Sequence, residues 1–362
     1  MKKLLLIAAL FASLSLDAQF VTTLAKNASE SQSDGIMYYL PKNVVRLEFT
    51  IEETEYCIGP YAEYSSKLLG VNDYIKENKS EFNIKSVDIQ TVSEIDPNAM
   101  YFISTDDKGK EPMPNIILDT DGLILALGYD NLPSNYIARN TFNDSDLEQT
   151  ERVEATFVEI LDNEVEIDDE DEDEDEDEDG GNGKRVKEIT KEDRAKAALE
   201  KISNIRTAYF ELISGAQEVA FGATTKYMAK TLQELEYEYV SLFKGKAVKN
   251  IYKKVIYITP EKNQSNIAVS VGKGQNVKVQ FDSHNALGNM NPTNDDVKNS
   301  AQVGKLFYRM PANTTVKVLS GNTVIAEKAL NISQFGDIRV VTVKGNKALF
   351  NPNTGQIISI TK

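Results

Sequence analysis

Apolar and polar residues alternate strictly in one stretch near the start of the chain. Residues 45–52, VRLEFTIE, place an apolar side chain at every second position and a polar one between. A period of two predicts a β-strand with one buried face and one solvated face. The stretch that follows, residues 59–70, predicts a short helix, because Pro60 suits a first helical position and Gly70 suits a C-terminal cap.

The rest of the first half has the pattern of β-structure. Residues 83–92 and 99–104 are strand-like, and the turn Asp96–Asn98 is expected to separate them. Residues 115–128 predict a hairpin around Asp121-Gly122, because Asp-Gly suits a tight turn between two apolar runs. The N-terminal half is therefore expected to be mostly β, with one small helix.

Helical periodicity begins at Thr190. Thr190 and Asp193 form a variant of the capping box, in which Asp stands where Glu is usual. Two stretches then carry apolar residues at alternating steps of four and three, and they end at Gly215 and Gly245. Two matched apolar seams with a short break between them predict an antiparallel helix hairpin. The seams are Ala198, Ile202, Ile205, Tyr209 and Leu212, then Met228, Leu232, Leu235, Tyr239 and Leu242.

After residue 250 the period returns to two. Short alternating stretches flank residue types that tight hairpin turns need, so several hairpins are predicted. They lie at residues 266–281 around Gly272-Lys273-Gly274, at 317–326 around Gly321-Asn322, at 338–350 around Gly345-Asn346, and at 350–360. The second half therefore reads as a helix hairpin followed by an antiparallel β-sandwich or a similar sheet.

Twelve consecutive acids, Asp168 to Asp179, interrupt these patterns and run into GGNG. Like charges at every position repel one another and no apolar residue is available for a core, so residues 162–189 are predicted to be a disordered linker. The chain is then an α+β protein of two β-rich domains, residues 19–161 and 190–362. The second is expected to begin with the helix hairpin.

The first residues have the layout of a secretory signal peptide. Lys2 and Lys3 precede an apolar stretch from Leu4 to Leu14, and cleavage is expected after Ala18. Residues 1–18 therefore predict export, to the periplasm or the outer surface of a Gram-negative bacterium. No later stretch approaches the length of a membrane-spanning segment, so no transmembrane segment is expected in the mature chain.

Charge narrows the range of partners. The formal net charge is −16, and most of it lies in the acidic run. Nucleic acid is excluded as a partner, because binding a phosphate backbone needs clustered Lys and Arg.

The chain has one Cys, Cys57, and one His, His284. A zinc site of Cys and His ligands cannot form within one chain of this composition, and an internal disulfide is impossible. His284 lies in a loop-like stretch, no G-x-S-x-G sequence surrounds any Ser, and Cys57 reads as a small buried hydrophobe. We therefore predict no catalytic residue, no cofactor and no enzymatic activity.

The acidic run resembles the start of a calcium loop, in which alternating acids supply oxygen ligands. Counting Asp175 as the first position places Val186 at the twelfth, where a bidentate Glu is required. We therefore predict no specific metal site, only weak, diffuse attraction of cations at Asp175, Asp177 and Asp179. The run is expected to be a solvated spacer or, alternatively, an acidic arm for a basic partner.

The order of these motifs resembles an uncharacterised family of exported proteins from Bacteroidetes-type bacteria. The motifs are GPYAEYSSKLLG, DPNAMYFI and LDTDGLILALG, then ISNIRTAYFELISG, LQELEYEYVSLFKGK, LFYRMPA and FNPNTGQIISI. The similarity covers residues 36–130 and 190–360. This resemblance implies the two-domain layout and a place in the cell envelope, and it supplies no catalytic or binding residues.

The function expected from the sequence is a non-enzymatic binding or assembly module of the cell envelope, with an envelope protein or polymer as partner. Two alternatives stay open. One is a hydrolase that uses two carboxylates on an envelope polymer or glycan, since the 56 acids of the chain offer many pairs. The other is a calcium-dependent adhesin.

Overall fold

The structure is a computed structural model. It describes residues 20–27, 35–104, 113–142, 152–161, 189–215, 222–262, 264–272, 274–284, 300–342 and 346–362. The predicted signal peptide and the acidic run, with Asp175, Asp177 and Asp179, lie outside the described residues.

Antiparallel sheets dominate the described chain, which confirms the α+β, β-rich fold class. A five-stranded sheet has the order β6-β2-β3-β1-β9, and two four-stranded sheets have the orders β11-β10-β8-β7 and β13-β12-β5-β4. The strands are β1 Val21–Leu24, β2 Gly35–Cys57, β3 Lys79–Ser104, β4 Ile116–Leu118, β5 Ile124–Leu127, β6 Lys246–Ile258, β7 Asn266–Gly272, β8 Gln275–His284, β9 Gln302–Val303, β10 Lys305–Ser320, β11 Thr323–Thr342, β12 Lys347–Phe350 and β13 Ile357–Thr361.

Helices make up a smaller part of the described chain. The α-helices are α1 Ser65–Leu68, α2 Lys191–Ser214 and α3 Thr225–Lys244, and the short 3-10 helices are η1 Ala25–Asn27, η2 Ala62–Tyr64 and η5 Gly222–Thr224. In the described residues, no helix has both the length and the apolar character needed to cross a membrane.

The chain forms two compact units that differ from the two domains expected from the sequence. The described residues of the first unit fall within Met1–Thr50, Ser86–Glu148 and Lys253–Lys362, and those of the second fall within Ile51–Lys85 and Gln149–Tyr252. Each unit therefore takes residues from both sides of the acidic run. The reason is strand pairing: β12 pairs with β5, and β1 pairs with β9, so strands far apart in the sequence share a sheet.

Aromatic rings fill the core of the first unit. Tyr101 stacks on Phe307 with ring centroids 4.3 Å apart, and Tyr38 stacks on Tyr101 at 5.5 Å. The Tyr38 hydroxyl donates to the carbonyl oxygen of Phe307 and accepts from its N–H, so this buried polar group is satisfied. Burial raises the pKa of Tyr38 well above its usual value, so its hydroxyl keeps its proton.

The predicted alternation of residues 45–52 holds within β2. The apolar side chains of residues 45–52 are all buried, but the opposite face of this stretch is less solvated than expected. Arg46 is buried, and its guanidinium donates to Glu48 over 2.6 Å. Because the charges of Arg46 and Glu48 compensate each other, this face of the strand can be buried without leaving an unpaired charge.

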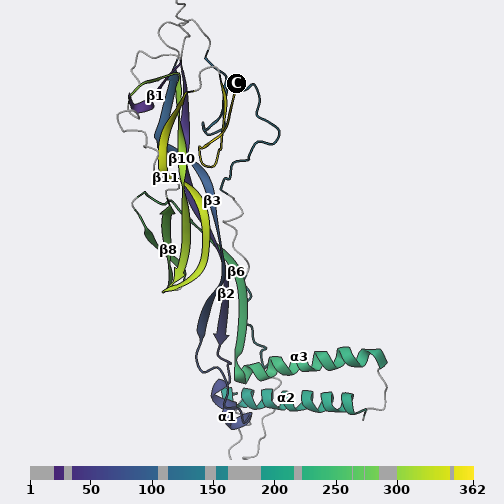
Figure 1. The fold of residues 1–362 in the computed structure, drawn as a ribbon. Coiled ribbons are helices and arrows are strands. Elements are labelled where there is room, and N and C mark those ends of the chain that lie inside the picture. Colours follow the sequence, from purple (N-terminus) through teal and green to yellow (C-terminus); the bar gives the residue numbers. More distant parts are fainter. Residues whose placement is uncertain are drawn as a thin grey trace, which may run out of the picture. The chain divides into compact units, whose positions relative to one another are not determined.

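The predicted helix hairpin is present in the second unit. Thr190 caps α2 with the reciprocal capping box expected with Asp193, and Gly215 ends it with φ 72°. Arg206 of α2 pairs with Glu236 of α3, and Tyr209, farther along α2, accepts from Gln233, which comes earlier in α3. The two helices lie side by side and run in opposite directions (Figure 1). The helices are therefore antiparallel.

One member of the second apolar seam is not packed as the spacing predicted. Leu235 is 40% exposed, whereas Leu242, nearer the end of the same helix, is fully buried. Only the C-terminal turns of α3 enter the core of the second unit, where Leu242 and Phe243 pack with α2 residues such as Ala198 and Ile202.

The expected turn at Asp96–Asn98 is wrong, because these residues lie inside the single strand β3. The Asp96 side chain accepts from the N–H of Asn98 over 3.0 Å, so the local bond typical of a turn forms without reversing the chain. The strand continues past Asn98 because Tyr101–Ser104 pair with β1.

Three of the four predicted hairpins in the second half are confirmed, and one is wrong. β7 pairs with β8, β10 with β11 across Gly321-Asn322, and β12 with β13. The strands on either side of Gly345-Asn346 do not pair with each other, because β11 lies in one sheet and β12 in another. Gly-Asn permits a tight turn, but β11 pairs with β10, and β12 pairs with β13 and β5.

Candidate binding pocket

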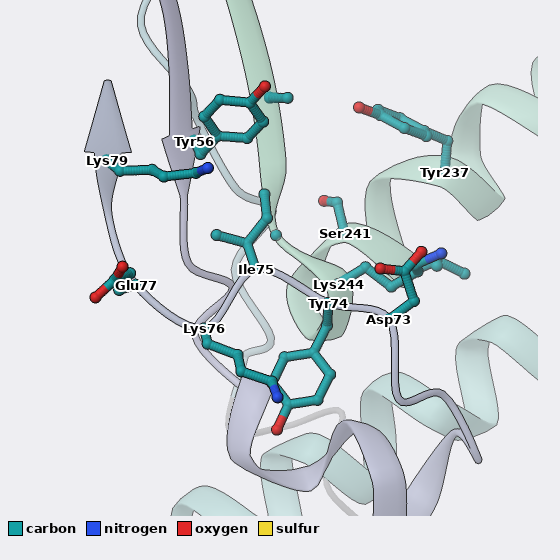
Figure 2. Close-up of a pocket in the computed structure, with 13 residues that line it drawn as sticks. Tyr56, Asp73, Tyr74, Ile75, Lys76, Glu77, Lys79, Tyr237, Ser241 and Lys244 are labelled. Carbon is teal, nitrogen blue, oxygen red and sulfur yellow. The ribbon is translucent and has the colours of Figure 1, made fainter. Parts of the chain in front are cut away.

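A pocket of about 720 Å³ opens within the second unit and has three tyrosines in its wall. Tyr56 comes from β2, Tyr74 from the segment between α1 and β3, and Tyr237 from α3, as Figure 2 shows. The other lining residues are Asp73, Ile75, Lys76, Glu77, Lys79, Val240, Ser241, Lys244, Gly245 and Ala247.

Hydrogen bonds hold the Tyr74 segment against the end of α3 and against Ile58, which follows β2. The N–H of Ile75 donates to the carbonyl oxygen of Lys244 over 2.9 Å. Farther along the same segment, the side-chain oxygen of Asn78 accepts from the N–H of Ile58 over 2.7 Å. A segment without regular secondary structure is thus fixed at two points, Ile75 and Asn78, both of which follow Tyr74 and which lie on either side of Lys76.

Gly245 allows the close approach of the chains beneath the pocket. It ends α3 with φ 81° and ψ 176°, a positive-φ conformation that favours glycine. A side-chain carbon at this position would lie 2.4 Å from the carbonyl oxygen of Cys57 and 3.0 Å from Ile75. Any larger residue would therefore push β2 or the Tyr74 segment away from the helix.

A charged pair orients the Tyr56 wall. The Tyr56 hydroxyl donates to Glu81 over 3.1 Å, and this bond raises the pKa of Tyr56. Lys79 donates to the other carboxylate oxygen of Glu81 over 2.8 Å and places its ammonium 4.6 Å from the centre of the Tyr56 ring. The Lys79 ammonium is the main cause of the lowered pKa of Glu81. Tyr56 is therefore held by a hydrogen bond and a cation–π contact together.

The α3 wall presents one stripe of the helix. Tyr237, Ser241 and Lys244 follow at steps of four and three, so they share a face. Tyr237 is 56% exposed, although aromatic side chains usually avoid solvent. Opposite, the Lys76 ammonium lies 5.6 Å from the centre of the Tyr74 ring.

The pocket combines ring faces with hydrogen-bonding groups of both charges. Aromatic rings supply contact area at a low cost in side-chain entropy, while the hydroxyls, Asp73, Glu77 and the lysines can orient polar groups. Such a wall suits a ligand that has both a flat or apolar surface and polar substituents.

The residues singled out in the sequence lie elsewhere. Cys57 ends β2 and is partly buried, so the expected burial holds only in part, and it does not line the pocket. His284 ends β8, and its side chain lies outside the described residues. Among the described residues, no group of three His, Cys, Asp or Glu side chains is placed to hold a metal ion.

Sequence reasoning missed the pocket, although one signal was available. Tyr237 lies off the apolar seam of α3, between Glu236 and Glu238. An aromatic residue on the polar side of an amphipathic helix is a candidate for binding, because packing does not explain it.

Comparison with known protein families supplies the identity of the chain. The model of a domain of unknown function, DUF4831, matches residues 34–167 and 187–358. The chain belongs to the DUF4831 family. The gap between the two matched segments, residues 168–186, contains the whole acidic run, and the pocket residues of the second unit all lie inside the matched segments. No curated protein matches the chain, and no solved structure does.

Proposed function

We propose that this DUF4831 protein is a non-enzymatic binding or assembly module of the cell envelope, and that its ligand binds in the tyrosine-lined pocket. The ligand would be part of an envelope protein or polymer that combines a flat or apolar surface with polar groups.

The observation that carries this proposal is that the exposed ring of Tyr237 lines the same pocket as Tyr56 and Tyr74. Exposing an aromatic face to water has a cost, whereas a bound ligand would cover it. The opposite walls are already held in place, by Glu81 at Tyr56 and by the carbonyl of Lys244 at the Tyr74 segment. A pocket whose walls are fixed before binding loses little entropy when the ligand arrives.

The location rests on residues 1–18, which have the charged start, apolar stretch and small final residue of an export signal. Fractionation of cells that produce the full chain and a chain without residues 2–18 tests this part. We expect the full chain in the envelope or periplasmic fraction and the shortened chain in the cytoplasm. The full chain in the cytoplasm would contradict the proposed location.

Three described carboxylates are suited to ion pairing and not to the role of a general acid. A glycosidase needs one carboxyl group that keeps its proton near neutral pH, which requires a raised pKa. The described carboxylates with a resolved shift, Glu48, Glu81 and Glu192, all have a lowered pKa because lysine or arginine side chains donate to them. They are therefore ionised and suited to ion pairs.

Co-sedimentation with isolated envelope fractions tests the pocket. We expect Tyr237→Ala to weaken binding about tenfold or more, since loss of an aromatic contact at the centre of a site costs 1–3 kcal/mol or more. The matched control is Tyr227→Ala, because Tyr227 lies on the same helix, is 74% exposed and is not among the pocket residues. Equal binding by both variants and the unchanged protein would overturn the assignment of the pocket. Treating the fraction with protease or with glycosidases identifies the class of ligand.

A further inference from the structure

Four charged side chains of the tyrosine-lined pocket make no ion pair with any described residue. They are Asp73, Lys76, Glu77 and Lys244, two of each sign (Figure 2). Lys79 beside them differs, because it is paired with Glu81 over 2.8 Å. A ligand in this pocket therefore meets both cationic and anionic groups that are able to bond to it.

This balance of charge selects against an ionic ligand. An anion would face the carboxylates of Asp73 and Glu77, and a cation would face the ammonium groups of Lys76 and Lys244. A hydroxyl group suits both signs, because it donates to a carboxylate, whereas its oxygen accepts from an ammonium group. The charged groups of the pocket therefore fit a neutral ligand that carries several hydroxyls.

The ring of Tyr237 supplies the apolar part of the site. It is 56% exposed, and within the described chain no other ring and no cation lies against it. The rings of Tyr56 and Tyr74, in contrast, each have a lysine ammonium group close to the ring centre, at 4.6 and 5.6 Å. A sugar ring matches the open face of Tyr237, because its C–H groups form an apolar surface and its hydroxyls lie at the rim.

Tyr237 also lines a second hollow, of about 710 Å³, toward the start of α3. The other lining residues of this hollow are Lys230, Thr231, Gln233, Glu234, Leu235 and Glu238. They again combine both charges and a hydroxyl with one exposed apolar side chain, that of Leu235. Because Tyr237 borders both hollows, a ligand that covers its ring can extend to either side of it.

We propose that the ligand of the pocket is a glycan of two or more neutral sugar rings. One ring stacks on Tyr237 in the pocket, and the chain continues along α3 into the second hollow. This inference rests on the function proposed above and names the chemical class of its ligand.

The second hollow favours a glycan over an extended peptide. All its described lining residues belong to α3, and main-chain groups inside a helix bond to one another. An extended peptide is recognised through unpaired main-chain groups of a strand, which this hollow does not present in the described chain. The hollow offers side chains, and the hydroxyls along a glycan can bond to them.

Competition for binding tests the class of the ligand. The full chain is co-sedimented with isolated envelope fractions, and treated samples of the same fraction are added as competitors. One sample is digested with protease, which cleaves peptide bonds. The other is treated with anhydrous trifluoromethanesulfonic acid, which cleaves glycosidic bonds and spares peptide bonds. We expect the protease-treated sample to compete as well as the untreated fraction, and the acid-treated sample to compete about tenfold less or weaker still.

Two variants separate this inference from the proposed function. Only binding that Tyr237→Ala loses and Tyr227→Ala retains is assigned to the pocket. Without such binding, the proposed function itself fails. If such binding is present but the protease-treated sample no longer competes, or the acid-treated sample still does, the ligand is not a glycan, although the assignment of the pocket stands.

Calorimetric titration with sized glycan fragments from the protease-treated sample tests the second hollow. Fragments of several rings should bind about tenfold tighter than single rings, because they reach beyond Tyr237. Leu235→Gln, at a site 40% exposed, should remove this gain and leave single-ring binding unchanged, and circular dichroism checks that the variant is folded. Equal affinities for short and long fragments would show that the ligand stays within one hollow. Binding that weakens steeply with added salt would show that the ligand is ionic.

Discussion

The guanidinium of Arg309 donates to the carboxylate of Asp96, and the two side chains are only 6% and 14% exposed. Arg309 lies on β10 and Asp96 on β3, so the pair joins two sheets of the first unit. Burial is the main cause of the lowered pKa of Arg309, and the neighbouring carboxylate opposes this effect. The pair is therefore one place where the first unit encloses a charge and compensates it.

Replacing Asp96 by alanine should lower the free energy of unfolding by about 3–5 kcal/mol, because the buried Arg309 cation would lose its partner. Denaturant unfolding at neutral pH measures the change. Asp88→Ala is the control on the same strand, since Asp88 is 50% exposed and its pair with Lys328 spans 3.6 Å. The control should change stability by less than about 1 kcal/mol. Equal effects of the two substitutions would contradict a special role for the buried pair.

Gly245→Ala and Gly215→Ala form a matched pair, because both glycines end a helix with positive φ. The left-handed backbone of Gly215 should cost about 1–2 kcal/mol. Gly245, with φ 81° and ψ 176°, lies in a region essentially restricted to glycine, and its backbone should cost about 1–3 kcal/mol. Only Gly245→Ala adds a clash with Cys57, whereas nothing lies within 4 Å at Gly215. We therefore expect a clearly larger loss of stability at Gly245, together with weaker ligand binding, and thermal unfolding compares the two. A loss no larger than that of Gly215→Ala would show that the chains beneath the pocket can separate freely.

Thr190→Ala should lower stability by about 1 kcal/mol, because the Thr190 side chain caps the start of α2. Thr207→Ala is the same substitution at an exposed position inside α2. It should leave stability unchanged or raise it slightly, since alanine has the higher helix propensity. Effects of the same sign and size at both positions would argue against the cap.

The ion pairs of Glu48 predict a contribution to acid sensitivity. Glu48 accepts from Lys253 over 2.5 Å and from Arg46 over 2.6 Å, and these bonds lower its pKa from the usual 4.5. A group with a lower pKa in the folded state contributes stability above its unfolded pKa and loses it as pH falls through the folded pKa. Glu48→Gln should therefore lower the free energy of unfolding at neutral pH. Below pH 4.5, the free energy of unfolding of this variant should fall less than that of the unchanged protein. Parallel stability curves across the acid range would contradict this assignment.

Deletion of residues 168–179 tests the spacer interpretation of the acidic run. We expect the melting temperature to stay essentially unchanged, because a run of like charges has no apolar side chains to pack. Differential scanning calorimetry in low salt measures the effect where charge interactions are strongest. A large drop in melting temperature would mean that the run binds a basic surface of the folded chain.

Local signals predicted individual elements of this fold well. The capping box of Thr190 and Asp193, the helix ends at Gly215 and Gly245, and the turn at Gly321-Asn322 all depend on a few neighbouring residues. Prediction failed where a local signal competed with strand pairing. Asp96–Asn98 make a turn-like hydrogen bond but remain in β3, and β12 pairs with β5, more than 200 residues earlier in the chain.

By itself, the sequence determined the class of the fold, the helix hairpin, most tight turns and the family, because periodicity, caps and turn residues act over a few positions. Only the tertiary structure decided which strands share a sheet, how the chain divides into units, and where the pocket lies. Tyr56, Tyr74 and Tyr237 are far apart in the sequence, and none of them carries a motif. They line one pocket because the end of α3, the end of β2 and the segment before β3 pack together, and only the packed chain specifies this arrangement.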